Sequence, residues 1–204
     1  PIRPREKIPC SEHGFKDATR DPQVIEAWVA RWPEMNLAVR TGEGSDLLVI
    51  DVDAHHGGLE AFQELVKEHG PLPRTVRART PNGGVHLWFR HVPGLKNLVG
   101  KLAPGVDLRT EGACAVVPPS RTEHKSYRWE PECSPFETEV AACPPWLEKL
   151  VTEASQNRVS TKPTNARAER LAPRVGERNQ MLTAFVGRLF ARGLDEEEVL
   201  RGAL

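Results

Sequence analysis

Residues 47–53 read Leu-Leu-Val-Ile-Asp-Val-Asp, and this stretch decides the fold. Its uninterrupted apolar run, partly β-branched, predicts a buried strand that ends in two carboxylates. Strand side chains alternate between the two faces, so we expect Asp51 and Asp53 on one face and Val52 on the other. Such carboxylates repel unless a positive charge lies between them, and hard oxygen ligands of this kind suit Mg²⁺ or Mn²⁺. A strand that simply runs into a polar loop is the alternative.

Helical and strand-like patterns alternate around this strand. Apolar spacing predicts helices at 22–32, 58–69 and 144–151. Strands are expected at 36–41, 75–80 and 84–90, with shorter ones near 105–109, 113–118 and 126–129. Gly42 and Gly44 predict a hairpin between 36–41 and 47–53, and the Asn82-Gly83 turn predicts another between 75–80 and 84–90. Hairpins interleaved with helices predict an α+β domain with an antiparallel or mixed sheet.

The composition is that of an ordinary globular chain, with 28 Lys+Arg against 28 Asp+Glu in 204 residues. No apolar run is long enough to cross a bilayer, so we expect no membrane contact. The cysteines form no CxxC pair, which favours a reducing cytoplasm over a disulfide framework. Cys10 and His13 could form a zinc site with Cys133 and Cys143, and ordinary free thiols are the alternative.

The chain divides into three parts. Residues 1–151 hold the elements above, and 152–172 are polar enough to be a linker. Residues 173–204 return to a helical pattern that runs to the last residue. We therefore expect a domain, a linker and a helical segment that begins a longer C-terminal region.

Two further stretches carry polar groups on expected strands. His86 follows the glycine turn and faces away from Val85 and Leu87, although a satisfied core histidine would show the same pattern. Asp107 and Arg109 share one strand face, and Ser120 follows a Pro-Pro pair that ends a strand. The window 74–109 is also basic and could bind anions. Together these groups suit phosphoryl transfer with two divalent metals, whereas no GxxxxGK[ST] motif of a P-loop NTPase is present.

An ordered series of motifs resembles the bifunctional primase/polymerase domain of the archaeo-eukaryotic primase superfamily. The resemblance covers roughly residues 5–150 and rests on Lys7-Ile8-Pro9, Asp51-Val52-Asp53, Gly84-Val85-His86, Val106-Asp107 and Pro118-Pro119-Ser120. It implies an RRM-like sheet with an N-terminal αβ unit, and a catalytic domain at 1–151. The implied activity is template-directed nucleotidyl transfer from a nucleoside triphosphate to a primer 3′-hydroxyl, with release of pyrophosphate.

The resemblance also implies roles for individual residues. Two Mg²⁺ or Mn²⁺ ions would be held by Asp51, Asp53 and Asp107, and His86 beside Gly84 would contact the nucleotide phosphates. Further triphosphate or template contacts are implied for Arg79, Arg109, Ser120 and Lys7. The implied partners are DNA template and primer, (d)NTP, and a fused or associated helicase.

Two other functions fit parts of the sequence. A single-strand DNA-binding module of a replication initiator needs the basic face but not the aspartates. A rolling-circle nicking endonuclease needs His-x-His metal ligands and a tyrosine nucleophile, for which the chain offers only the adjacent His55-His56 pair and Tyr127.

Overall fold

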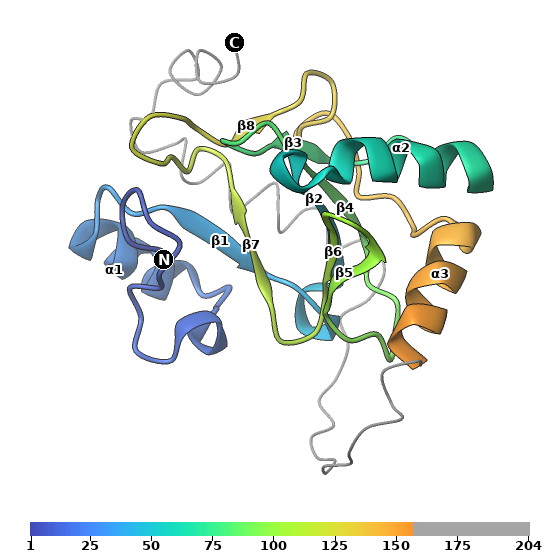
Figure 1. Ribbon diagram of the computed structural model, residues 1–204. Helices are drawn as coiled ribbons and strands as arrows, with labels where there is room; N and C mark the ends of the chain where they lie inside the picture. Colours follow the sequence, from blue (N-terminus) through green and yellow to red (C-terminus); the bar gives the residue numbers. More distant parts are fainter. Residues whose placement is uncertain (157–204) are drawn as a thin grey trace.

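A computed structural model describes residues 1–156 of the chain (Figure 1). Its centre is an antiparallel sheet of six strands in the order β5-β6-β2-β4-β3-β8. The strand of the Asp51 motif, β2, lies in the middle of this sheet, between β6 and β4. The strands span Leu47–Val52 (β2), Arg77–Arg79 (β3), Val85–Arg90 (β4), Leu98–Ala103 (β5), Val106–Arg109 (β6) and Arg128–Trp129 (β8).

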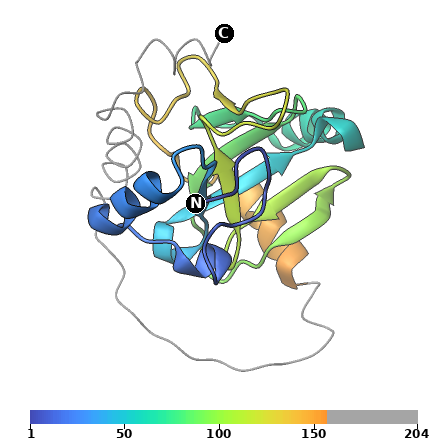
Figure 2. The same ribbon diagram turned by 90° about the vertical axis from the view of Figure 1, so that its left-hand side faces the viewer.

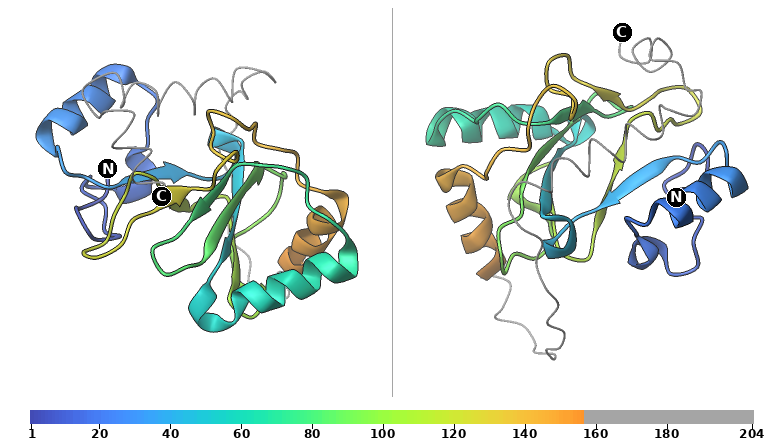
Figure 3. Two further views of the ribbon diagram at one scale, coloured as in Figure 1. Left: turned by 90° about the horizontal axis from the view of Figure 1, so that it is seen from above. Right: turned by 180° about the vertical axis from the view of Figure 1, so that it is seen from behind.

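Two helices cover one face of this sheet, as Figures 1 and 3 show. They are α2, Gly58–His69, and α3, Pro145–Gln156. Leu48, Ile50 and Val52 of β2 face them and pack in one core with Phe62 and Leu147. These residues are nearly inaccessible to solvent, so the even positions of β2 anchor the sheet to its helices.

A second sheet of two strands covers the other face, which is turned toward the viewer in Figure 2. It pairs β1, Leu37–Arg40, with β7, Cys114–Val117, in antiparallel register. Val49 of β2 and Trp88 of β4 are fully buried beneath it. Because both faces of β2 are covered, the strand reads as a continuous apolar run up to Asp51.

The N-terminal residues extend this second layer. Helix α1, Pro22–Arg31, lies beyond β1 and begins as predicted, with Asp21 accepting a hydrogen bond from the Gln23 N–H. Short 3-10 turns lie at Gly14–Asp17, Glu43–Ser45 and Ala54–His56. The α+β class and the N-terminal unit of α1 and β1 are therefore confirmed.

The predicted hairpin between 36–41 and 47–53 is wrong. The two strands lie in different sheets, and only the isolated bridge between Gly42 and Leu47 joins them. Gly42 adopts φ 107°, and a side chain there would collide with Glu111, so this turn passes the chain from one sheet to the other. The other predicted hairpin is confirmed, with Thr80 and Gly84 closing the turn between β3 and β4.

One strand and the end of one helix also differ from expectation. Strand β5 was not predicted, and it occupies the edge of the sheet beside β6. Helix α3 continues to Gln156 instead of ending at residue 151, because its last turns bury Val151 and Ser155. The remainder of the expected linker and the helical segment 173–204 lie outside the described residues. Within residues 1–156, no helix combines the length and apolar character needed to cross a membrane.

Candidate functional site

Three of the predicted site residues lie in a single row across the middle of the large sheet. Asp51 of β2 is the register partner of His86 in β4 on one side and of Asp107 in β6 on the other. Partners in register share a face, and this face is the one that carries Val49 and Trp88. The row therefore lies next to the Val49–Trp88 pair, which is buried under β1 and β7, and next to Arg109, the partner of Val49 in β6.

Asp51 is the centre of the row. One carboxylate oxygen, Oδ1, lies 3.3 Å from His86 Nε2, and the other, Oδ2, accepts from Arg109 Nη2 at 2.9 Å and Nε at 3.0 Å. Burial on its own would raise the pKa of Asp51, but the hydrogen bond and charge of His86 and the charge of Arg109 outweigh it. The pKa of Asp51 therefore lies at about 2, and the group is ionised at neutral pH.

Arg109 links the two carboxylates of the row. It lies two residues beyond Asp107 on the same face of β6, and its Nη2 is also 3.4 Å from Asp107 Oδ2. One guanidinium nitrogen thus faces both Asp51 and Asp107, which neutralises the repulsion between adjacent carboxylates. The side chain is 38% exposed, so it lies at the solvent edge of the site.

Asp53 does not join this group. Its carboxylate accepts from the backbone N–H of His55 at 2.8 Å and lies 2.8 Å from His56 Nδ1. These hydrogen bonds, led by that from the His55 backbone, lower the pKa of Asp53. The residue therefore caps the 3-10 turn that follows β2, and its side chain remains 43% exposed.

His86 is held from the side opposite to Asp51 by aromatic rings. Its ring centroid lies 5.8 Å from that of Tyr127 and 6.5 Å from that of Trp88. The residue is only 5% exposed, and its buried Nδ1 has no hydrogen-bond partner within the described residues. A buried ring nitrogen without a partner is costly in a purely structural role, and a group that hydrogen-bonds to Nδ1 would remove that cost.

Gly84 serves the sheet rather than a ligand in this structure. A Cβ on Gly84 would collide with the carbonyl oxygen of Val52 on the neighbouring strand. Glycine therefore allows β4 to approach β2 closely where the row containing Asp51 and His86 begins.

Arg79 lies on the wrong face for the predicted phosphate contact. Ala78 of β3 is the register partner of His86, so Arg79, the partner of Val85, points to the opposite side of the sheet. There its Nε pairs with Glu130 Oε1 at 2.7 Å. Arg79 therefore lies on the other face from His86, and its triphosphate or template contact stays a prediction.

Ser120 and Lys7 are likewise not among the contacts that join the row. The Ser120 hydroxyl is buried, donates to the Leu37 carbonyl at 3.1 Å and accepts from the Leu37 N–H at 2.8 Å. This reciprocal pair ties the chain after β7 to the start of β1. Lys7 is exposed in the N-terminal loop. Their predicted ligand contacts have no support in this geometry.

Tyr127, the tyrosine considered as nucleophile of a nicking endonuclease, lies beside His86. It is 5% exposed, and burial, with a smaller effect of the Asp51 charge, raises its pKa to about 12. A buried phenol with so high a pKa is a poor nucleophile, which argues against the nicking endonuclease. The sequence pattern around Tyr127 contains no feature that would predict its contact with His86.

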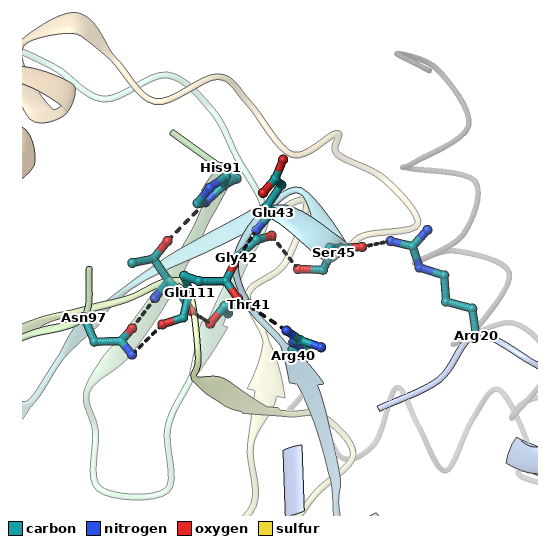
Figure 4. Close-up of polar contacts among 11 residues, drawn as sticks. Arg20, Arg40, Thr41, Gly42, Glu43, Ser45, His91, Asn97 and Glu111 are labelled. Carbon is teal, nitrogen blue, oxygen red and sulfur yellow. Dashed lines mark hydrogen bonds and ion pairs between the residues drawn. The ribbon is translucent and has the colours of Figure 1, made fainter. Parts of the chain in front are cut away.

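A second polar cluster, shown in Figure 4, braces the two sheets at the far end of β2. Thr41 Oγ1 donates to the Thr110 carbonyl at 2.7 Å, and the Thr110 N–H donates to Asn97 Oδ1 at 2.6 Å. Glu111 accepts from the Glu43 N–H and pairs with Arg40 at 3.3 Å. These hydrogen bonds and ion pairs join β1 and its following turn to the segment after β6.

The donor chemistry of the row fits a hard divalent cation, although the side chains do not form a finished ligand set. Across residues 1–156, no three His, Cys, Asp or Glu side chains are arranged to hold a metal ion. Arg109 occupies the space between Asp51 and Asp107, and Asp53 is turned to its own cap. Two carboxylates share one positive group here, so this point of the sheet carries negative charge that a positive group neutralises. For the zinc site considered as an alternative at Cys10, His13, Cys133 and Cys143, the described part of the chain offers no such cluster, and these cysteines are free.

Comparison with known protein families identifies one match for the chain. The family model described as "Bifunctional DNA primase/polymerase, N-terminal" matches residues 1–146, which include every residue of the row. A search of curated proteins finds none that matches the chain.

Proposed function

Because the chain belongs to the bifunctional DNA primase/polymerase family, we propose that the row of Asp51, His86 and Asp107, with Arg109, is its active site for nucleotidyl transfer. The family acts on DNA and nucleotides, so the chain is a nucleotidyltransferase of the primase/polymerase type. The reaction proposed is attack of a primer 3′-hydroxyl on the α-phosphate of a template-paired nucleoside triphosphate, with pyrophosphate as the leaving group.

The alignment of the row carries this proposal. Two carboxylates, an imidazole and a guanidinium lie on one face of the central strands, at the edge of the apolar layer. Strands packed on both faces hold such groups rigidly, which is what a site that must position a triphosphate and a primer end needs. A module that only binds single-stranded DNA has no use for carboxylates on its binding face, because they repel phosphates.

The chain's own residues have separate roles in this proposal. Asp51 and Asp107, with Asp53 as a third carboxylate, would hold the divalent ions that such nucleotidyltransferases use. When bound, these ions supply positive charge that stabilises the reacting phosphate. The Nδ1 of His86 has no partner within the described residues, and we assign it to a contact with a nucleotide phosphate. Arg109 carries the remaining positive charge on the same face.

Primer extension on a defined template tests this function. The protein should add the complementary nucleotide to a labelled primer, and it should stop when EDTA removes divalent ions. Retained DNA binding without extension at saturating Mn²⁺ would contradict the proposal and favour the single-strand DNA-binding module.

A further inference from the structure

Arg109 makes contacts that conflict with metal binding by the two aspartates. Its Nη2 lies 2.9 Å from Asp51 Oδ2 and 3.4 Å from Asp107 Oδ2, so the guanidinium fills the place where a cation shared by these carboxylates would lie. The Asp51 oxygen that faces His86, Oδ1, is not the one that Arg109 uses. Each oxygen of Asp51 therefore has its own partner: Oδ1 contacts the buried His86, and Oδ2 contacts Arg109, whose side chain is 38% exposed.

We propose that Arg109 is an exchangeable counter-ion, which neutralises Asp51 and Asp107 before a metal arrives and competes with the metal for their Oδ2 atoms. The inference rests on the proposed function, because it takes these aspartates as metal ligands. The guanidinium is 38% exposed and extends from the last residue of β6, so it can leave the carboxylates without disturbing the strand. His86 keeps Asp51 in place when Arg109 leaves.

The competition has a direct consequence for metal affinity. A metal that binds wild-type protein must first break the contacts of Arg109, and the lost ion pairs oppose binding. A variant that lacks the guanidinium has no such contacts to break. It also removes the positive group that the two adjacent carboxylates share, which lowers its stability until a cation is supplied.

The test measures Mn²⁺ binding to the full chain without DNA or nucleotide, by calorimetric titration and by thermal melting. Arg109→Met keeps the aliphatic length and removes the charge, and it should bind Mn²⁺ at least about tenfold more tightly than wild type, the change expected from one partly exposed cation facing two carboxylates. In EDTA its Tm should be lower than that of wild type, and Mn²⁺ should raise it more. Arg109→Lys keeps a charge but not the bridge, so its affinity should lie in between.

Arg40→Met is the matched control, because Arg40 is also 38% exposed and pairs with one carboxylate, that of Glu111, away from the row. It should bind Mn²⁺ as wild type does. Equal or weaker Mn²⁺ binding by Arg109→Met, or by Arg109→Lys if the first variant does not fold, would overturn the proposal, and so would no Mn²⁺ binding by any variant. Because this readout needs no catalysis, tighter Mn²⁺ binding by Arg109→Met together with no primer extension by the wild-type protein would refute the proposed function and leave the counter-ion role standing.

Discussion

Replacement of His86 separates a nucleotide contact from a packing role. His86→Ala removes the imidazole between Asp51 and the rings of Tyr127 and Trp88. If the ring contacts a phosphate, the variant loses one charge-assisted hydrogen bond worth about 1.5–3 kcal/mol. That loss corresponds to a KM for nucleotide raised about 10- to 100-fold, with little change in DNA affinity.

The same change should also cost stability. A buried side chain of this size leaves a cavity, and Asp51 loses a partner at 3.3 Å, so we expect the free energy of unfolding to fall by about 1–3 kcal/mol. Steady-state primer extension over a range of nucleotide concentrations gives KM, fluorescence anisotropy gives the Kd for DNA, and urea unfolding gives the stability. His86→Gln, which retains an N–H donor near the position of Nε2, should be affected less in stability.

His91→Ala provides the matched control for this experiment. His91 is a partly buried histidine just beyond β4, hydrogen-bonded to Thr110 in the brace between the sheets. Its loss should lower the stability while the KM for nucleotide stays unchanged. An unchanged KM in His86→Ala, together with a lower stability, would show that His86 is a core histidine and would contradict its contact with the nucleotide.

Three further changes test the assignments around the row. Ser120→Ala should lower the free energy of unfolding by about 1–3 kcal/mol, because the buried Leu37 N–H loses its acceptor. The KM for nucleotide should stay unchanged, and a raised KM at full stability would instead support the predicted phosphate contact. Arg79→Met should leave the nucleotide KM unchanged, since Arg79 points away from His86, and a weaker nucleotide affinity would contradict the assigned face. Burial, then the charge of Glu148, raises the pKa of Cys143 to about 12, so the folded state disfavours the thiolate. The stability advantage of wild type over Cys143→Ala should be full below about pH 9 and fall as the pH rises toward about 12, whereas parallel urea-unfolding series over this range would contradict it.

The alternation of side chains along strands was enough to predict most of the row. Asp51, His86, Asp107 and Arg109 each lie opposite to apolar neighbours in the sequence, and the structure places all four on one face. Alternation could not predict that Asp51 would be the register partner of both His86 and Asp107, because register depends on pairing between strands far apart in the chain. It also could not show that Arg109 would lie between the two carboxylates.

The predicted hairpin failed because the true partner of β1 is not visible in the local pattern. Gly42 and Gly44 do mark a turn, but the partner of β1 is β7, which follows much later in the chain. Arg79 was within reach of sequence reasoning, since counting outward from the 81–84 turn places Ala78, not Arg79, opposite His86. Ser120 follows a Pro-Pro pair as expected, and only the structure shows that Leu37 takes both of its hydrogen bonds.

The most direct test of the active-site assignment compares Asp51→Asn and Asp107→Asn with Asp46→Asn in primer extension at saturating Mn²⁺. Asp46 precedes β2 at φ 58°, a left-handed conformation that asparagine tolerates, and it pairs with Arg90 instead of the row. All three variants exchange a carboxylate for an amide of the same shape. We expect Asp46→Asn to extend the primer as wild type does, whereas Asp51→Asn and Asp107→Asn should bind DNA and add no nucleotide. Near wild-type extension by either row variant would contradict it.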